Sequence, residues 1–352
     1  MEQKAILVGV FIHDNADSST DESMDELETL AESAGAEVAG VCVQNLKNVN
    51  NATYVGSGKL EEIHELCKAE QPDMVIFDDE LSGSQVRNIE RELDVRVIDR
   101  SRLILDIFAQ RASTAEGKCQ VELAQLKYML PRLSGVGASM SRLGGGIGTR
   151  GPGETKLETD RRHLKERINR LQNELKKIEQ HRALIRKKRQ GGNMPNVAIV
   201  GYTNAGKSTL LNALTDAGAY EADKLFATLD PLTRIMRVDK DFSVLLTDTV
   251  GFIRKLPHHL IEAFRSTLEE SVFADLILHV ADVTSLELDT QTSVVNNLLS
   301  ELGAADKPII TVYNKIDGFT GERPAAPNSV CVSAKTGEGI NKLVSMIKEF
   351  LQ

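Results

Sequence analysis

The sequence predicts an α/β protein with an N-terminal α/β domain, a long antiparallel helical hairpin and a second α/β domain whose sheet is mostly parallel. Apolar runs alternate with amphipathic helical patterns over residues 1–100 and again over 193–352, which is typical of parallel sheets covered by helices. Between them, residues 101–192 carry two series of apolar residues at spacings of three and four, the period of a helix. A chain of 352 residues is long enough for these separate cores.

The first domain is expected to contain four strands, within AILVGVFI, AEVAGVCV, MVIFDD and RVIDR, and three intervening helices, within MDELETLAES, KLEEIHELCKAE and SQVRNIERELD. We expect Ser57 to be the N-cap of the second helix. The nearby GSGK is similar to part of a phosphate loop, but Lys59 is followed by Leu60, which cannot hold Mg²⁺ as Ser or Thr would. A turn is the favoured reading there, and a second nucleotide site in this domain stays open as an alternative.

The hairpin is predicted from two helical series joined by a glycine-rich loop. Apolar residues from Ile104 to Leu130 indicate one helix that Pro131 ends. A second series, from Leu157 to Ile185, has the narrow apolar seam of a coiled coil. A loop of about 25 residues is expected to join the two helices, and the stretch SRLGGGIGTRGPGETKLETDRR, with six glycines and four arginines, is expected at the tip of the hairpin. KKRQGGN is expected to be a linker to the next domain.

Charge is distributed unevenly along this acidic chain. The net charge is -9, yet residues 132–189 hold sixteen Lys and Arg against six Asp and Glu, which leaves -19 for the rest. This pattern fits an element that faces a polyanion, and it also fits a solvated charged helix. No apolar run of about 18 residues predicts a membrane span. The N-terminus lacks signal-peptide features and the four cysteines form no CxxC pair, so we expect a cytoplasmic protein.

A phosphate-binding loop opens the second domain. GYTNAGKS, Gly201 to Ser208, matches GxxxxGK[ST], follows the strand pattern NVAIV and opens the helix pattern STLLNAL. Glycines let backbone N–H groups surround phosphates, and the helix N-terminus favours their negative charge. Lys207 is expected to neutralise the β- and γ-phosphates, and the Ser208 hydroxyl to hold Mg²⁺. The sequence therefore predicts a P-loop nucleotide-binding domain.

Three further motifs follow in order and indicate GTP. In DTVG, Asp248 can hold Mg²⁺ through water, and the Gly251 N–H can contact the γ-phosphate. In NKID, Asp317 can accept hydrogen bonds from guanine N1 and N2, a donor pair that adenine lacks. In SAK, the Ala334 N–H is expected to contact guanine O6. The ordered set resembles the translation-factor-related GTPases, which implies binding of GTP and GDP and hydrolysis of GTP to GDP and phosphate.

The sequence identifies fewer of the residues needed for catalysis than of the residues needed for nucleotide binding. Thr228, in DKLFATLDPLTR, is the candidate that caps Mg²⁺ and the γ-phosphate, with Thr233 as the alternative and an ordinary surface threonine as the third reading. Phe252 stands where Ras-like GTPases carry a Gln that orients the attacking water. We therefore expect slow turnover by the protein alone and stimulation by a large partner. Asn204 is either a turn residue, the favoured reading, or a helper of K⁺ beside the phosphates.

The predicted catalytic residues are Lys207, Thr228 and Gly251, and the predicted metal ligands are Ser208, Thr228 and, through water, Asp248. The predicted nucleotide site comprises Gly201, Tyr202, Thr203, Asn204, Ala205, Gly206, Lys207, Ser208, Thr209, Phe226, Ala227, Thr228, Asp248, Thr249, Val250, Gly251, Asn314, Lys315, Asp317, Ser333, Ala334 and Lys335.

Three stretches, YVGSGKLEEI, SRLGGGIGTRGPGETKLETDRR and FATLDP, together resemble the HflX family of ribosome-associated GTPases, and the resemblance covers essentially the whole chain. It implies a protein that binds the large ribosomal subunit and its rRNA near the peptidyl-transferase centre. It further implies splitting of stalled or idle ribosomes with GTP, often under stress, and release after hydrolysis. A large-subunit assembly or quality-control factor and a non-ribosomal signalling GTPase are the alternatives.

The RNA contacts are expected at the arginines of the glycine-rich stretch, because guanidinium groups pair with phosphates and stack on bases. These residues are Arg142, Arg150, Arg161 and Arg162. We expect the protein to act as a monomer.

Overall fold

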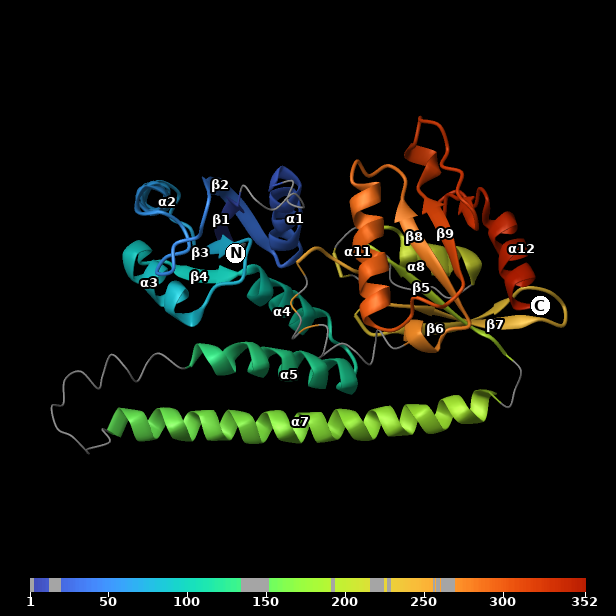
Figure 1. Ribbon diagram of the computed structural model, residues 1–352, viewed down its shortest axis with the longest axis horizontal. Coiled ribbons are helices and arrows are strands. Elements are labelled where there is room, and N and C mark those ends of the chain that lie inside the picture. Colours follow the sequence, from blue (N-terminus) through green and yellow to red (C-terminus); the bar gives the residue numbers. More distant parts are fainter. Residues whose placement is uncertain are drawn as a thin grey trace. The chain divides into compact units, whose positions relative to one another are not determined.

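The computed structural model describes residues 3–12, 20–133, 152–190, 194–215, 225–226, 229–255, 257, 260 and 270–352. The chain forms two compact units (Figure 1). The N-terminal unit comprises residues 1–110 and 119–175, and the C-terminal unit comprises residues 111–118 and 176–352. No helix in the described part of the chain is both long and apolar enough to cross a membrane.

The N-terminal unit contains a four-stranded sheet with the order β2-β1-β3-β4, and all of its strand pairs are parallel. Its strands are β1 (Gln3–Ile12), β2 (Ala36–Leu46), β3 (Met74–Phe77) and β4 (Arg96–Asp99). Its first helices are α1 (Thr20–Ser33), α2 (Ser57–Glu70) and α3 (Gly83–Leu93). This alternation confirms the α/β prediction. Ile6 and Phe77 of the sheet and Ile63 of α2 are buried in one hydrophobic core.

One predicted cap in this unit is wrong. Helix α2 includes Ser57, and its N-cap is Gly56, which makes no side-chain capping bond. The Gly56 N–H instead donates to Gln44 Oε1 at 2.9 Å, which anchors the turn to β2. By contrast, α3 has a full capping box, in which Ser82 and Gln85 satisfy each other's backbone N–H groups.

The first arm of the hairpin is two helices, α4 (Arg100–Arg111) and α5 (Ala115–Arg132), so the prediction of one helix from Ile104 to Leu130 is wrong. The Thr114 hydroxyl accepts the Gly117 N–H at 2.9 Å and so starts α5 afresh. Pro131 lies inside the last turn of α5, one residue before the helix ends. The apolar spacing continues through the break, which is why periodicity alone does not reveal it.

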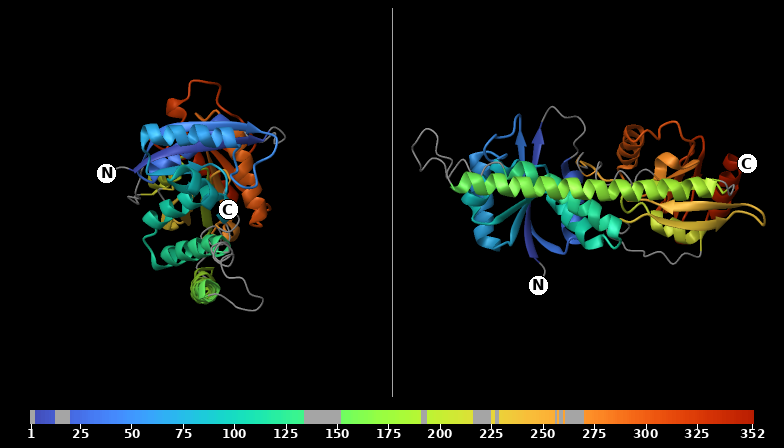
Figure 2. Two further views of the ribbon diagram at one scale, coloured as in Figure 1. Left: turned by 90° about the vertical axis from the view of Figure 1, so that its left-hand side faces the viewer. Right: turned by 90° about the horizontal axis from the view of Figure 1, so that it is seen from below.

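The second arm is α7 (Pro152–Gln190), one continuous helix in Figure 2. Proline is favoured at a first helical position, and here it starts the helix inside the glycine-rich stretch. The helix therefore begins five residues before the predicted start at Leu157, so the expectation of a loop is wrong for residues 152–156. Residues 134–151 lie outside the described residues.

The arms α5 and α7 run antiparallel, as predicted. In the N-terminal unit Arg167 pairs with Glu122 at 2.7 Å, and in the C-terminal unit Arg182 pairs with Glu116 at 2.7 Å. Positions therefore descend along α5 as they ascend along α7. The seam of α7 buries apolar side chains in the N-terminal unit, namely Ile168, Leu171 and Leu175, and this burial holds the pair of helices together.

The C-terminal unit contains a six-stranded sheet with the order β10-β9-β8-β5-β7-β6, in which only the β6–β7 pair is antiparallel. Its strands are β5 (Asn196–Gly201), β6 (Leu232–Arg237), β7 (Ser243–Asp248), β8 (Leu276–Asp282), β9 (Ile309–Asn314) and β10 (Ser329–Cys331). Its helices include α8 (Lys207–Leu214), α11 (Leu288–Glu301), the short 3₁₀ helix η2 (Ile316–Gly318) and α12 (Ile340–Leu351). The mostly parallel sheet is confirmed.

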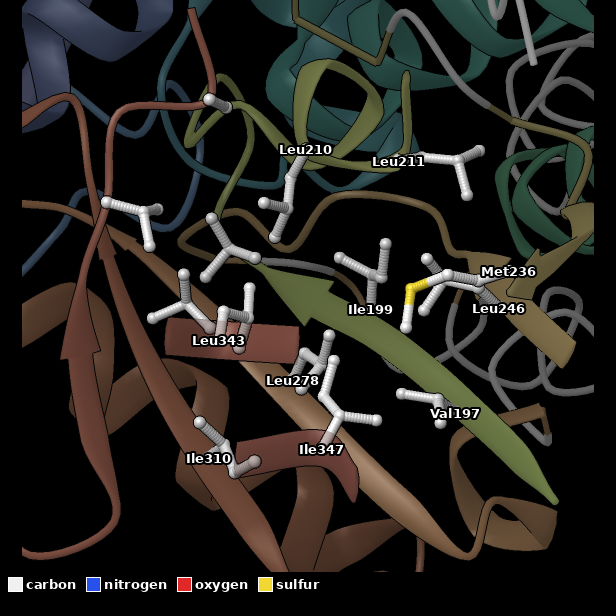
Figure 3. Packing of buried hydrophobic residues seen from close by; sticks show 14 of the residues in the cluster. Val197, Ile199, Leu210, Leu211, Met236, Leu246, Leu278, Ile310, Leu343 and Ile347 are labelled. Atoms are coloured by element: carbon white, nitrogen blue, oxygen red, sulfur yellow. The ribbon is translucent and has the colours of Figure 1, made fainter. Parts of the chain in front are cut away.

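The core of this unit fixes the strands that carry the site. Side chains of β5, β7 and β8 meet those of α8 and α12 in one cluster, which includes Ile199, Leu246, Leu210 and Ile347 (Figure 3). Burying each such side chain contributes about 1.5–3 kcal/mol. The strand ends that leave this core are therefore held in place.

Candidate guanine-nucleotide site

The loops with the predicted motifs gather at one edge of the C-terminal sheet. Strand β5 lies between β7 and β8. The chain runs from β5 to β6 and β7 on one side and then crosses to β8 on the other side, and such a switch point is where open α/β sheets bind ligands. GYTNAGKS follows β5, DTVG follows β7, NKID ends β9, and SAK follows β10. Because these strands are parallel, their carboxyl ends and the motifs meet at the same edge.

The phosphate loop has a backbone that only certain residues tolerate. Gly206 has φ 88°, and a Cβ there would lie 2.3 Å from Asn314 Nδ2. Asn204 is left-handed as well, with φ 61°, a conformation that asparagine adopts more readily than most residues. Helix α8 begins directly after Gly206, so its free N–H groups face the end of β5, as phosphate binding requires.

The side chains of Lys207 and Thr203 offer hydrogen-bond donors to an anion. The Lys207 ammonium is buried and donates to the Tyr202 carbonyl at 2.7 Å. Burial lowers the pKa of Lys207 to about 8, although the nearby Asp248 carboxylate works in the opposite direction. The buried hydroxyl of Thr203 has no hydrogen-bond partner among the described residues. A phosphate group would satisfy both side chains, so the residues present fit a nucleotide.

Two of the expected magnesium ligands, Ser208 and Asp248, lie together. The Ser208 hydroxyl donates to Asp248 Oδ2 at 2.7 Å, and Asp248 is fully buried. A hydroxyl and a carboxylate are the oxygen ligands that Mg²⁺ takes, usually completed by phosphates and water. No group of three or more His, Cys, Asp or Glu residues in the described part of the chain could hold a metal by itself. The residues therefore fit a Mg²⁺ ion that is shared with a nucleotide.

The segment after β7 is fixed against the phosphate loop. The Phe252 N–H donates to the Gly201 carbonyl at 3.1 Å, and the Phe252 carbonyl accepts the Thr203 N–H at 2.8 Å. A Cβ on Gly251 would lie 2.9 Å from Lys207 Nζ, so glycine is what allows this approach. The Phe252 ring is buried in the core, where it offers no group to a water molecule.

The base-binding loops are tied to the phosphate loop through Asn314. Its Nδ2 donates to the Ala205 carbonyl at 2.9 Å, and its Oδ1 accepts the Ala334 N–H at 3.0 Å. That N–H is therefore already bonded in this structure, which differs from the expectation that it points at guanine O6. The Ala334 N–H thus helps to fix the Asn314 side chain, which in turn bonds the phosphate loop at Ala205.

Asp317 is the exposed carboxylate at this edge. The Ser333 hydroxyl donates to Asp317 Oδ1 at 2.6 Å and lowers the pKa of Asp317. The side chain is thereby oriented and kept ionised, as two hydrogen bonds from guanine would require. Lys315 pairs with Asp282 at 2.7 Å, a site contact that the motifs did not predict. The signal for this contact was the end of β8, because the parallel strands β5, β7 and β9 of the same sheet each end in a predicted site residue.

Some predicted residues are not described by the structure, and others lie on elements outside the nucleotide loops. Arg142, Arg150, Ala227 and Thr228 are outside the described residues. Arg161 and Arg162 are on α7, and Arg162 is exposed. The Thr233 hydroxyl lies 3.0 Å from the Thr247 hydroxyl across β6 and β7.

The remaining site positions lie in or beside these loops. Thr249 donates to the Ile199 carbonyl at 2.8 Å. Val250 and Phe226 are buried, Thr209 is half-buried at the start of α8, and Lys335 is exposed.

Three family models match successive parts of the chain. Residues 21–109 match a model described as GTP-binding GTPase N-terminal, residues 111–189 match the GTP-binding GTPase middle region, and residues 196–315 match a 50S ribosome-binding GTPase. GTPase HflX of Caldanaerobacter subterraneus subsp. tengcongensis is 53% identical over 99% of this chain and 81% of its own length. GTPase HflX of Escherichia coli is 46% identical over 99% of this chain and 83% of its own.

Solved structures agree with these sequence relatives. The crystal structure of SsGBP with GDP has a TM-score of 0.53 at 28% identity and covers 99% of this chain and 98% of its own. A GTP-binding protein from Sulfolobus solfataricus with GDP has a TM-score of 0.50 at 27% identity, with the same coverage. Because curated relatives match along nearly its whole length, the chain belongs to the HflX family of GTPases, and its phosphate-loop site hydrolyses GTP.

Proposed function

We propose that this GTPase binds the large ribosomal subunit near the peptidyl-transferase centre and splits stalled or idle ribosomes while GTP is bound, with hydrolysis allowing release. The observation that carries the proposal is the concentration of positive charge in residues 132–189 of an otherwise acidic chain. The match of residues 196–315 to a 50S ribosome-binding GTPase supports the same partner. Binding to ribosomal RNA would place the protein in the cytoplasm.

The length of the hairpin supports such a contact. Helix α7 has 39 residues, which corresponds to roughly 60 Å at 1.5 Å per residue. Its pairing with α5 through Glu122–Arg167 and Glu116–Arg182 stiffens the arm. Arginines at its glycine-rich end can bind phosphates bidentately, and RNA is recognised largely by shape and backbone.

Hydrolysis by the protein alone should be slow. Mg²⁺, held by Ser208, by Asp248 through water and by Thr228, would neutralise charge on the β- and γ-phosphates. Lys207 and the Gly251 N–H would stabilise charge on the same oxygens. The buried Phe252 ring offers nothing that orients the attacking water. We therefore propose that the ribosome completes the catalytic site and accelerates GTP hydrolysis.

The test is sedimentation of whole ribosomes in a sucrose gradient with the full-length protein and a non-hydrolysable GTP analogue, and with GDP as the control. Conversion of whole ribosomes to subunits with the analogue, but not with GDP, is the expected result. Binding only to precursor particles would instead identify an assembly or quality-control factor. Absence of co-sedimentation would contradict any ribosomal role and favour a signalling GTPase.

A potassium ion is the open question in the catalytic site. Asn204 is exposed and left-handed in the phosphate loop, which suits a turn residue and also leaves its side chain free to reach a cation beside the phosphates. Comparing hydrolysis rates in KCl and in NaCl decides between the two roles. Equal rates would assign Asn204 to the turn alone.

A further inference from the structure

Asp230 makes a dense set of hydrogen bonds with the residues that start helix α5. Its Oδ2 accepts the Ser113 N–H at 3.1 Å, the Ser113 hydroxyl at 2.7 Å and the Thr114 N–H at 3.0 Å. Its Oδ1 accepts the Thr114 hydroxyl. All these residues belong to the C-terminal unit, although 116 positions separate Asp230 from Thr114. We call this set of bonds the Asp230 clasp.

The clasp lies close in sequence to the nucleotide site. Leu232, two residues after Asp230, pairs with Asp248, the carboxylate expected to face Mg²⁺. Thr228, the proposed contact to Mg²⁺ and the γ-phosphate, is two residues before Asp230, a span of at most about 7 Å. The chain is therefore anchored on the C-terminal side of Thr228 by Asp230 and then by β6.

The other end of the clasp leads into the hairpin. Ser113 and Thr114 precede α5, whose first turn also carries Glu116, paired with Arg182 of α7 at 2.7 Å. The last residue of α5, Arg132, donates to Glu80 and Asp99 in the N-terminal unit, each at 3.0 Å. A single helix thus begins at the clasp and ends on the N-terminal domain.

We propose that Asp230 is a positioning residue that couples the nucleotide state to helix α5, such that the GTP-bound arrangement and the clasp stabilise each other. The proposal rests on the role assigned to Thr228 above. An anchored segment loses less conformational freedom when Thr228 contacts the γ-phosphate. By reciprocity, GTP must then strengthen the clasp by the same factor by which the clasp favours GTP.

Gly117 provides an independent way to open the clasp from the helix side. A Cβ at Gly117 would lie 2.4 Å from Asp230 Oδ1 and 3.2 Å from the Thr114 hydroxyl. Gly117→Ala should therefore displace Asp230 without touching the nucleotide site. Alanine favours helix formation over glycine, so this variant tests the clasp without weakening the intrinsic stability of α5.

The primary test measures amide hydrogen exchange at Ser113 and Thr114, because these N–H groups donate directly to Asp230. Purified full-length protein is compared with GDP and with Mg²⁺ and a non-hydrolysable GTP analogue. We expect exchange at both amides to be about 5-fold slower or more with the analogue. Equal exchange in the two states, or faster exchange with the analogue, would overturn the proposal.

The second measurement is the ratio of Kd values for the GTP analogue and for GDP. Asp230→Ala and Gly117→Ala should each raise this ratio about 5-fold or more, and the double variant should do little more than either, since both open the same contact. An unchanged ratio in folded Gly117→Ala would contradict the proposal. The wild-type exchange data decide the matter if Asp230→Ala does not fold.

Matched controls separate the clasp from general effects. Gly58→Ala places a Cβ in open space in α2, and Asp239→Asn removes an exposed carboxylate that pairs with Lys348; both should leave the Kd ratio unchanged. Thr228→Ala should abolish the difference in exchange between the two nucleotides. None of these assays contains ribosomes, so a failure to split ribosomes and a failure of the clasp give separate results.

Discussion

Asp317 is the residue that we expect to select the base. Its carboxylate is exposed at the site and is held by the Ser333 hydroxyl at 2.6 Å. Asp317→Asn replaces one acceptor by an amide donor, which suits the O2 of xanthine rather than the N2 amine of guanine. We expect GTP affinity to fall roughly 10-fold or more and xanthosine triphosphate to become the preferred ligand.

Fluorescence titration with both nucleotides measures this change. Ser333→Ala is the matched control, because it loosens Asp317 without changing its chemistry. That variant should lose some affinity for GTP and gain none for xanthosine triphosphate. Retention of full GTP affinity by Asp317→Asn would remove Asp317 from the base-binding site.

His279 should make folding stability depend on pH. The side chain is 2% exposed in β8, and burial, with the charge of Lys207 as the next cause, lowers its pKa to about 4 from 6.5. Below pH 6.5 the unfolded chain binds a proton that the folded chain does not, so stability falls as the pH decreases toward 4. Between pH 7 and pH 5 this loss is about 2 kcal/mol.

His279→Gln should remove that part of the pH dependence, as urea unfolding at pH 7 and pH 5 would measure. His163→Gln, at a position on α7 whose side chain is 64% exposed, should keep the wild-type difference. An identical pH dependence in His279→Gln and in the wild type would show that burial does not hold this histidine neutral.

At the level of elements, the seam of α7 should account for much of the stability of the hairpin. Leu171 is 2% exposed and Leu184, on the same helix, is 62% exposed. Leu171→Ala removes buried contacts and should cost about 2–5 kcal/mol, whereas Leu184→Ala should stay within about 0.5 kcal/mol of the wild type. Thermal unfolding of the two variants measures the difference, and equal effects would mean that the seam is not a packed interface.

At the scale of the whole molecule, charge is separated from the chemistry. The nucleotide motifs lie in an acidic region of the sequence, and the net charge of +10 lies in residues 132–189, which precede them. Replacing both Arg142 and Arg150 by Ala should spare GTP binding and weaken ribosome binding. It should also lower the salt dependence of binding, because fewer counterions are released from RNA.

Ribosome binding at several salt concentrations, alongside GTP titration, tests this separation. Arg323→Ala in the C-terminal unit, which removes a cation that pairs with Glu338 at 2.8 Å, should affect neither activity. If GTP binding and ribosome binding fell together in the Arg142 and Arg150 double variant, the tip would not be a separate RNA-binding element.

The nucleotide motifs and the alternation of strands and helices were predictable because each depends on a few consecutive residues. GYTNAGKS needs only its own glycines and the helix that follows it, and an apolar run such as NVAIVG indicates a buried strand wherever it occurs. The fold of both domains and the antiparallel hairpin followed from such local patterns. The HflX resemblance likewise rested on three contiguous stretches.

Only the tertiary structure decided the contacts between residues distant in sequence. The break before α5 depends on Asp230 and on the cap at Thr114, while the apolar period of the helix runs through it unchanged. The antiparallel strand β6 and the bond from the Ala334 N–H to Asn314 likewise depend on which loops the sheet brings side by side. A local pattern determines how a segment folds, whereas the partner of a polar group is determined by the strand order and the packing around it.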